Sequence, residues 1–341
     1  FKVPTFTNVI SLDLNQWKEL GISKEYAEIQ MKAVEAWKKL SAILSCSCMP
    51  FSCGAIPRYQ EHVAYADTAT VIFGNSFFGA RSNRESDLIC LGAAVCGRVP
   101  KFGYHLAENR IGQVAINVNA EFHTDSDYDA LGYHLGRIVK DKVPVFKNLD
   151  KNISMEAFMQ LGAALASTGT VSLFHCLEIT PEVKQDPILY GAKGIIEEIE
   201  LTEADIKNTY TELNTTVDSD IDLVFIGSPH CTVEKLKYIA DRLDGKRIHD
   251  DVKVWISASS AVRHLASRSD AVQNIERTGA TVLSDTCAVI APTRELGYRN
   301  VATDSAKAQV YMSDFGFNVR FGTTDDCLEA ALKGHWSAHG V

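Results

Sequence analysis

Apolar residues recur at helical spacing in several segments of the first half of the chain. The clearest helix is predicted for residues 24–40, where apolar positions follow at intervals of three or four and Ser23 is suited to be the N-cap. Shorter patterns predict helices at 88–96, at 128–139 and from Ser154 to about 167. Continuous apolar runs predict strands at 71–74, 114–118 and 169–177.

The second half alternates regularly between strands and helices. Strands are predicted at 223–226, 252–256, 281–283, 301–303 and 318–321, and the stretches between most of them have helical periodicity. Alternation of this kind is typical of an α/β fold with mostly parallel sheets and helices on both faces. A charged segment at 180–220, with a possible helix at 204–213, suggests a boundary. We therefore expect an N-terminal α/β catalytic region at 1–217 and a doubly wound domain at 218–341.

Two cysteines directly follow predicted strands. Cys231 ends the turn Gly227–Cys231, and Cys287 ends the turn Ser284–Cys287. Ligands of open parallel sheets bind beyond the carboxyl ends of the strands, so both thiols are candidate metal ligands. Cys48, in an irregular cysteine-rich stretch at 41–59, is a third candidate. Thiolates favour iron–sulfur clusters, zinc or copper, and zinc stays open on ligand type alone.

The composition narrows the class of protein. The 341 residues are 46% hydrophobic and 23% charged, with a net charge of −9. No apolar run approaches the roughly 20 residues of a membrane span, and no basic stripe favours nucleic acid. The sequence has neither a G-x-G-x-x-G motif nor a Walker A motif, so nucleotide chemistry lacks support. These features favour a cytoplasmic enzyme acting on a small molecule.

Two polar segments follow predicted strands and are candidates for anion binding. The segment Asn75–Glu85 contains two arginines, whose guanidinium groups pair bidentately with carboxylates or phosphates. The segment Asp304–Lys307 places a hydroxyl and an ammonium group at a helix N-terminus. A solvated loop in the first case and simple helix capping in the second are the alternatives.

At these positions the chain resembles the aconitase X family, specifically its large catalytic subunit or domain, along nearly its whole length. The stretches that carry the resemblance are Val3–Asn8, Cys48–Phe51, Pro57–Arg58, Glu61–His62, Asn75–Arg84, Gly97–Pro100, Gly103–Leu106, Phe174–His175, Ile179–Glu182, Gly227–Cys231, Asp285–Cys287 and Thr303–Lys307.

The resemblance implies an aconitase-like fold with the site at the domain interface. It implies an iron centre, either an iron–sulfur cluster (2Fe–2S or 4Fe–4S) or mononuclear iron, held by Cys48, Cys231 and Cys287. It also implies a small swivelling subunit or domain as partner. The activity expected is that of a hydro-lyase, a dehydratase acting on a small hydroxy acid.

Two substrates follow from the resemblance. The first is cis-3-hydroxy-L-proline, which would give 1-pyrroline-2-carboxylate, because Asp87 and residues 8–13 look closer to the hydroxyproline group. The second is mevalonate 5-phosphate, for which more basic side chains would be expected.

The residues expected to act on the substrate are also carried over from the resemblance. Catalytic candidates are Ser76, Arg81 and, as the base, Lys307, unless the small partner supplies the base. Candidate substrate-binding residues are Thr7, Asn8, His62, Asn75, Asn83, Arg84 and Ser305. A non-catalytic metal-binding paralogue and a zinc hydrolase remain the alternatives to an iron-dependent dehydratase.

Overall fold

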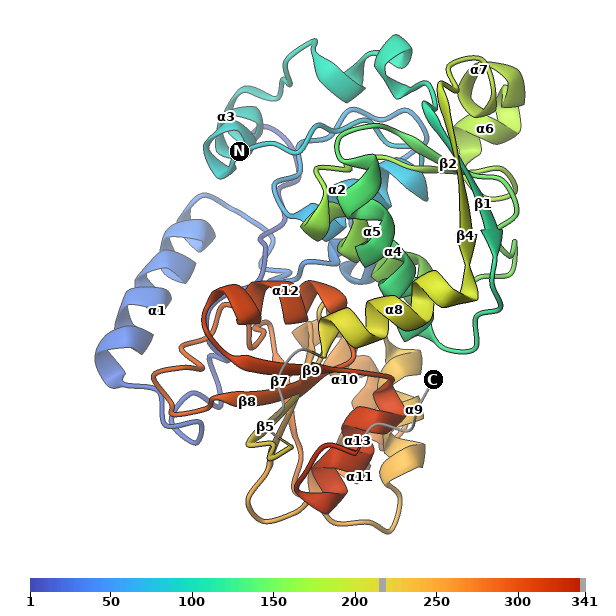
Figure 1. The fold of residues 1–341 in the computed structure, drawn as a ribbon. Coiled ribbons are helices and arrows are strands. Elements are labelled where there is room, and N and C mark those ends of the chain that lie inside the picture. Colours follow the sequence, from blue (N-terminus) through green and yellow to red (C-terminus); the bar gives the residue numbers. More distant parts are fainter. Residues whose placement is uncertain (215–218, 338–341) are drawn as a thin grey trace. The chain divides into compact units, whose positions relative to one another are not determined.

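The chain forms two units, each built around its own parallel sheet. The computed structural model describes residues 1–214 and 219–337 (Figure 1). Unit 1 contains Phe1–Pro4 and Ile56–Thr209, and unit 2 contains Thr5–Ala55 and Tyr210–Val341. This division differs from the one drawn from the sequence, because residues 5–55, and Cys48 with them, group with the C-terminal part of the chain.

Residues 5–55 belong to unit 2 because hydrogen bonds fasten them to the end of one of its strands. The carboxylate of Asp13 is fully buried, and its Oδ2 accepts from the backbone N–H of Ser284 at 2.7 Å. Gln16 Nε2 donates both to Asp13 and to the carbonyl of Val282. The backbone N–H of Ile10 donates to the carbonyl of Asp285. Contacts between residues so distant in sequence leave no signal in a local hydrophobic pattern.

The sheet of unit 1 has four parallel strands in the order β3-β2-β1-β4. The strands are β1 (Val114–Asn119), β2 (Pro144–Phe146), β3 (His175–Cys176) and β4 (Glu197–Thr202). The helices are α2 (Thr68–Ser76), α3 (Asp87–Cys96), η2 (Gly103–His105), η3 (Ala107–Arg110), α4 (Asp125–Val139), α5 (Met155–Thr168), α6 (Pro181–Gln185) and α7 (Pro187–Gly191). Helix α8 (Glu203–Leu213) contains the boundary between the units.

Two sequence-based assignments in unit 1 are wrong. Residues 71–74 were expected to form a strand, but they lie inside α2, all of whose residues are buried. A helix that is apolar on every side has no periodicity to separate it from a buried strand. Its start is fixed by Asp67, whose Oδ1 accepts from the backbone N–H groups of Ala69 and Thr70. Of the strand expected at 169–177, only β3 forms.

Helices α4 and α5 lie side by side and pack at very short range (Figure 1). The close approach occurs at Gly132 and Gly136, one turn apart on α4. A Cβ atom on Gly132 would lie 2.4 Å from the carbonyl oxygen of Leu161, and one on Gly136 would lie 2.9 Å from that of Leu165. The expected helix starting after Ser154 is confirmed, since the Ser154 hydroxyl accepts from the backbone N–H of Ala157.

The sheet of unit 2 has five parallel strands in the order β7-β6-β5-β8-β9. The strands are β5 (Leu223–Ile226), β6 (Lys253–Ala258), β7 (Thr281–Ser284), β8 (Asn300–Thr303) and β9 (Asn318–Phe321). The helices are α1 (Lys24–Lys39), η1 (Pro50–Cys53), α9 (Val233–Leu243), α10 (Ser260–Ser267), α11 (Ala271–Arg277), α12 (Ala306–Asp314) and α13 (Thr324–Lys333). From β5 the chain adds β6 and β7 on one side, and it then adds β8 and β9 on the other side of β5. The strand order therefore reverses between β5 and β8, which is the switch point of the sheet.

Both faces of this sheet are covered, as the continuous apolar strands predicted. On β5, Val224 and Ile226 belong to the core that includes α9, α10, α11 and α13. Leu223 and Phe225 belong to the opposite core, which includes α12. A central strand buried on both faces has no polar side to alternate with its apolar side. The expected doubly wound α/β architecture is therefore confirmed.

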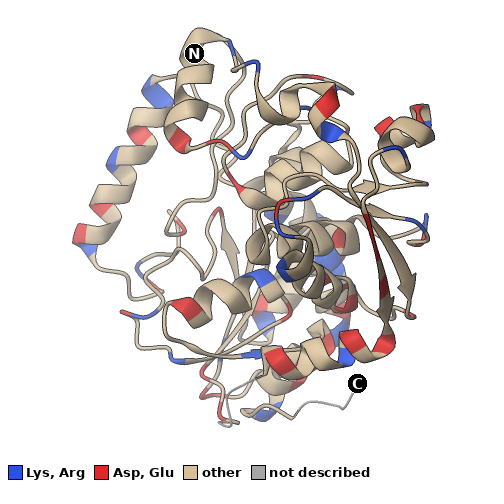
Figure 2. Cartoon of the chain, turned by 45° about the horizontal axis from the view of Figure 1, so that its top comes forward, with Lys and Arg blue, Asp and Glu red and all other residues tan. Residues whose placement is uncertain are grey.

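Exposed helices carry mixed charges. Lysines and glutamates are interspersed along α1 (Figure 2). Lys24 pairs with Glu28, and Lys38 pairs with Glu35. The side chain of Ser23 caps this helix through the backbone N–H of Tyr26, as expected. In the part of the chain that the structure describes, no helix is both long and apolar enough to cross a bilayer.

The glycine contact between α4 and α5 gives a prediction about stability. Gly132→Ala should lower the free energy of unfolding by about 1–3 kcal/mol, because the added methyl group meets a backbone oxygen and a packed side chain. Gly92→Ala is the matched control: Gly92 is exposed on α3 and an added Cβ would meet no atom within 4 Å. It should raise the free energy of unfolding by about 0.5–1 kcal/mol through helix propensity. Urea denaturation of both variants measures the difference, and equal effects would show that α4 and α5 do not pack so closely.

Candidate functional site

Cys231 and Cys287 lie just past the carboxyl ends of β5 and β7, as the sequence predicted. The turn before Cys231 is fixed by Gly227, whose φ of +121° favours glycine and whose Cβ would lie 2.5 Å from the carbonyl oxygen of Ser257. The backbone N–H of Cys231 donates to that same carbonyl at 2.9 Å. The turn before Cys287 is held by a bond from the N–H of Asp285 to the carbonyl of Ala258. Both turns are thus attached to β6.

A buried histidine joins three distant segments of unit 2. His230 Nδ1 lies 3.2 Å from the Ser47 hydroxyl, and its Nε2 lies 3.0 Å from the carbonyl oxygen of Thr286. These contacts link residues separated by 183 and 56 positions in the sequence. Ser47, His230 and Thr286 each directly precede one of the three candidate metal ligands, which are Cys48, Cys231 and Cys287.

Both nitrogens of His230 have hydrogen-bond partners. A carbonyl oxygen only accepts, so Nε2 carries a proton and donates it to Thr286. Nδ1 bonds to Ser47 Oγ, which also accepts from the backbone N–H of Met49 at 3.0 Å. The imidazole is therefore held at both nitrogens. This arrangement fixes the backbone on which the three thiols are carried.

The three thiols suit a sulfur-ligated metal in their chemistry and surroundings. Their side chains are buried, with exposed fractions of 6% for Cys48, 3% for Cys231 and 8% for Cys287. The Sγ of Cys48 accepts from the backbone N–H of His230 at 3.3 Å, a contact that favours a thiolate. Among residues 1–214 and 219–337, no three His, Cys, Asp or Glu side chains are already arranged as a metal site. Three buried thiols on segments linked through His230 fit an iron centre. To bind the iron, the three side chains would have to move closer together.

Thr7 holds the segment that leads to Cys48. Its Oγ1 accepts from the backbone N–H of Cys46 at 3.2 Å, and its carbonyl accepts from the hydroxyl of Ser45 at 2.7 Å. Asn8, also predicted to bind substrate, is exposed, and its Oδ1 accepts from the N–H of Val9. The described contacts of Thr7 assign it a positioning role for the 45–48 segment.

Other titratable groups near these turns have raised pKa values. Burial is the main cause that raises the pKa of Asp285 to about 6, and the nearby Asp13 carboxylate adds to it. Burial likewise raises the pKa of the Cys46 and Cys53 thiols. Burial also holds the pKa of Cys327, in the core on α13, well above its usual range.

The Asp304–Lys307 segment follows β8 at the switch point of the sheet. The hydroxyl of Ser305 caps α12 by accepting from the backbone N–H of Ala308 at 3.1 Å. Asp304 Oδ2 lies 3.1 Å from Lys235 Nζ and accepts from the hydroxyl of Thr324. Lys307 is buried in the first turn of α12, with 8% of its surface exposed. Helix capping thus accounts for the side chain of Ser305.

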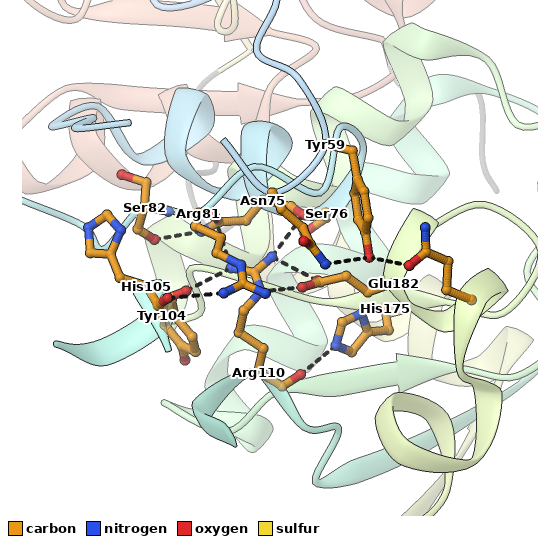
Figure 3. A network of polar contacts seen from close by, with 12 residues as sticks. Tyr59, Asn75, Ser76, Arg81, Ser82, Tyr104, His105, Arg110, His175 and Glu182 are labelled. Carbon is orange, nitrogen blue, oxygen red and sulfur yellow. Dashed lines mark hydrogen bonds and ion pairs between the residues drawn. The ribbon is translucent and has the colours of Figure 1, made fainter. Parts of the chain in front are cut away.

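Unit 1 contains a fully buried arginine within a network of polar contacts (Figure 3). Arg110 pairs bidentately with Glu182 through Nε to Oε1 at 2.6 Å and Nη2 to Oε2 at 2.8 Å. Its remaining donors reach Asn75 Oδ1, the carbonyl of Asn75 and the carbonyl of Tyr104. Its own carbonyl accepts from Nε2 of His175, whose pKa is lowered to about 4 mainly by burial.

The amide of Asn75 is fully used by this framework. Nδ2 donates to the carbonyls of Ser82 and Ser172, and Oδ1 accepts from the N–H of Ser82 and from Arg110. Ser76 is also fully buried, and its Oγ accepts from the N–H of Phe174 at 2.9 Å. Asn75 and Ser76 therefore hold the backbone of this segment, and their expected contacts with a substrate stay predictions.

The remaining polar residues of the Asn75–Glu85 segment differ in exposure. Arg84 is exposed and donates to the carbonyl of Ala166. Arg81 donates through Nη1 to the carbonyl of His105 at 3.3 Å, while its Nε is buried without a hydrogen-bond partner among the described residues. Asn83 donates to Glu85 and to the carbonyl of Phe102. Both arginines of this segment therefore keep donor groups that an anion could use, and Arg84 is the more exposed of the two.

His62 lies beside Arg81 and contacts a second histidine. Its Nδ1 is 2.9 Å from Nδ1 of His105, and the two rings are stacked with centroids 5.1 Å apart. His105 is buried, and its Nε2 lies 3.9 Å from Oε1 of Glu85. Two imidazoles and a carboxylate therefore stand in a row next to a guanidinium group.

The structure is that of an α/β protein with two parallel sheets and cysteines just beyond two strand ends. Comparison with family models identifies the family to which the chain belongs. The models that match are the aconitase X first domain over residues 1–108, the second domain over 112–211 and the third domain over 221–333. The crystal structure of Thermococcus kodakaraensis aconitase X in its holo-form superposes with a TM-score of 0.87 at 33% identity, covering 96% of this chain and 81% of that chain.

Curated relatives agree with the family models. The phosphomevalonate dehydratase large subunit of Methanocaldococcus jannaschii is 38% identical over 96% of this chain and 82% of the relative. The cis-3-hydroxy-L-proline dehydratase of Pseudomonas aeruginosa is 30% identical over 98% of this chain and 58% of the relative. The chain therefore belongs to the aconitase X family and, like these relatives, is a dehydratase, an enzyme of the hydro-lyase class.

Sequence reasoning did not single out several residues that organise these sites. Arg110 lies in a polar stretch that resembles a surface loop, and Glu182 lies at the start of a short helix after Pro181. His230 sits inside the predicted metal turn but was not given a role. Burial of an arginine can be predicted from the sequence when its neighbours along the chain are apolar. The residues just before Arg110 are mostly polar, so its burial becomes visible only in the folded chain.

The buried ion pair gives a prediction for unit 1. Glu182→Gln should lower the free energy of unfolding by about 3–5 kcal/mol, because it leaves a fully buried guanidinium group without its counter-charge. Glu197→Gln is the control, since Glu197 pairs with Lys142 at a site where both side chains are more than a third exposed. That change should cost at most about 1 kcal/mol. Denaturant unfolding of both variants measures the difference, and a Glu182 variant as stable as the control would show that the pair contributes little.

Proposed function

We propose that this chain is the large, catalytic subunit of an iron-dependent dehydratase that acts on mevalonate 5-phosphate together with a small partner subunit. The observation that carries the iron part is the linkage of Ser47, His230 and Thr286, which gathers the segments of the three cysteines. The substrate and the two-subunit arrangement are supported by the relatives, since the more similar ones are named large subunits and match this chain over more of their length.

This order of substrates is the reverse of the one suggested by the sequence. The second candidate, cis-3-hydroxy-L-proline, is favoured by Asp87 and by residues 8–13, which look closer to the hydroxyproline group. Unit 1 offers Arg81, with a buried and unpartnered Nε among the described residues, and the exposed Arg84 as anion-binding groups. A guanidinium group pairs equally well with a carboxylate and a phosphate, so these residues suit either substrate.

The roles of the chain's residues follow from their chemistry. Cys48, Cys231 and Cys287 would hold the iron centre, cluster or mononuclear, which supplies a Lewis acid for the leaving hydroxyl group. Thr7 and His230 would keep the cysteine segments in place. Arg81 would orient an anionic group of the substrate and so reduce the entropic cost of reaching the reactive geometry. Sequence reasoning assigned the proton acceptor to Lys307 or to the small subunit, and both remain proposals.

The metal assignment has a direct test. In protein prepared without oxygen, Cys48→Ser, Cys231→Ser and Cys287→Ser should each lose most of the bound iron and its thiolate-to-iron absorption, because a hydroxyl group is a poor ligand for a thiophilic centre. Cys96→Ser, at an exposed position of α3, should bind as much iron as the unchanged protein. Iron per chain and the visible absorption spectrum are measured together. Full iron content in the Cys231 and Cys287 variants would exclude the three-cysteine centre, and zinc in place of iron would favour a zinc enzyme.

The choice of substrate needs the reconstituted complex of both subunits. The kcat/KM for dehydration of mevalonate 5-phosphate should be at least about 100-fold higher than that for cis-3-hydroxy-L-proline. A site whose polar groups match one substrate leaves some of those groups unpaired when the other substrate binds. Product is followed by mass spectrometry for both compounds. Activity on cis-3-hydroxy-L-proline alone would restore the order suggested by the sequence. Iron-loaded complex that dehydrates neither compound would refute both substrates.

A further inference from the structure

Two short extended segments fix the position of His62 in unit 1. Residues 61–65 and 81–85 run parallel, with bridges between His62 and Arg81 and between Tyr65 and Arg84. The N–H of Arg81 donates to the carbonyl of Glu61 at 2.8 Å, and the N–H of Val63 donates to the carbonyl of Arg81 at 3.0 Å. This pairing leaves the side chain of His62 exposed and beside that of Arg81. His62 is thus held by backbone bonds rather than lying in a free loop.

The second histidine is brought to this pair by Asn83. Oδ1 of Asn83 accepts from the N–H of Tyr104 at 2.7 Å, and its Nδ2 donates to the carbonyl of Phe102. The contact requires Gly103, since a Cβ there would lie 2.2 Å from Asn83 Oδ1. As a result, η2 ends with the ring of His105 facing His62.

The charge of Glu85 selects the tautomers of the two rings. Since the two Nδ1 atoms are 2.9 Å apart, one carries a proton and the other accepts it. His105 Nε2 is buried and faces the Glu85 carboxylate at 3.9 Å, too far for a hydrogen bond but close enough to favour a proton on Nε2 over a lone pair. His105 Nδ1 is then the acceptor, and His62 donates from Nδ1. Nε2 of His62 is left with a free lone pair.

We propose that His62 Nε2 is the proton acceptor of the dehydration, and that Glu85 and His105 are positioning residues that keep its lone pair available. In this arrangement His62 is the base, His105 orients it, and the Glu85 carboxylate orients His105, as in a catalytic triad. This inference rests on the proposed function. It gives His62 a chemical role beyond the substrate contact expected from the sequence, and it names a base other than Lys307.

The charges around His62 keep it in the form that accepts a proton. Burial lowers the pKa of His62, and the Arg81 and Arg110 guanidinium groups lower it further. The pKa of His105 is also lowered, first by burial and then by His62, Arg110 and Arg81, while Glu85 opposes the shift. These shifts favour the neutral form of both rings. An activity that needs neutral His62 is present above its pKa and is lost as the pH falls through it.

The step balances without any further reactant. Nε2 of His62 takes the proton from the carbon next to the one that bears the hydroxyl group. The electron pair of that C–H bond becomes the new carbon–carbon double bond, and the C–O bond breaks with its pair on oxygen. The departing hydroxide and the proton released by His62 together make one molecule of water, and the imidazole returns to its neutral form.

A spectroscopic experiment tests the arrangement without any substrate. In protein labelled with nitrogen-15 on histidine, two-dimensional spectra distinguish the two neutral tautomers, and His62→Gln and His105→Gln assign the signals. We expect His62 protonated on Nδ1 and His105 protonated on Nε2. Glu85→Gln, which keeps the shape and removes the charge, should shift His105 toward a mixture of tautomers. A proton on Nε2 of His62 in the unchanged protein would overturn the proposal.

Kinetics of the reconstituted complex test the role in catalysis. His62→Gln should lower kcat by about 10²–10⁴-fold with iron content unchanged, as expected for loss of a general base. Glu85→Gln should move the acidic limb of the kcat/KM profile to lower pH, because removal of the carboxylate disfavours the protonated imidazole. His264→Gln, at an exposed position of α10, is the control and should leave both parameters unchanged. Normal kcat in the His62 variant would overturn the proposal. If the unchanged complex dehydrates neither substrate, the proposed function fails, and the tautomer spectra still decide the imidazole arrangement.

Discussion

Burying a polar side chain costs free energy unless most of its polar atoms find partners, and this cost shapes both units of the chain. In unit 1 the side chain is Arg110, which is fully buried and distributes its donors over Glu182, Asn75 and Tyr104. In unit 2 it is His230, held at Ser47 and Thr286. Because the partners come from distant segments, satisfying one side chain fixes several pieces of irregular backbone at once. The cost of an unpaired group is what makes each arrangement specific.

These two side chains explain why irregular loops can carry chemistry with definite geometry. The loops that bear Cys48, Cys231 and Cys287 have few of the regular backbone bonds of a helix or strand, and His230 supplies the missing fixed points. In unit 1, Arg110 and Asn75 do the same for the segment that carries Arg81. In both units, residues next to the proposed metal-binding and anion-binding groups hold much of the surrounding backbone in place.

Most of unit 2 could be predicted from the sequence, because its central strands are continuous apolar runs separated by periodic helices. The placement of Cys231 and Cys287 at the strand ends followed from the same pattern. The helix α2 could not be predicted, since a fully buried helix and a buried strand are both uniformly apolar. The grouping of residues 5–55 with unit 2 could not be predicted either, because Asp13 reaches a strand 271 positions away.

The sequence by itself determined the α/β class, the candidate thiols and the family resemblance, because hydrophobic periodicity and short motifs are local properties of the chain. Only the tertiary structure decided which polar residues are occupied by the framework and which keep capacity for chemistry. Asn75, Ser76 and Ser305 were candidates through the family resemblance, and in the folded chain their side chains hold backbone groups. The role proposed for His62 depends on its contact with His105, which in turn faces Glu85, and both are distant from it in the sequence. The physical reason is that a hydrogen bond or a charge contact depends on distance in space, which the order of residues does not specify.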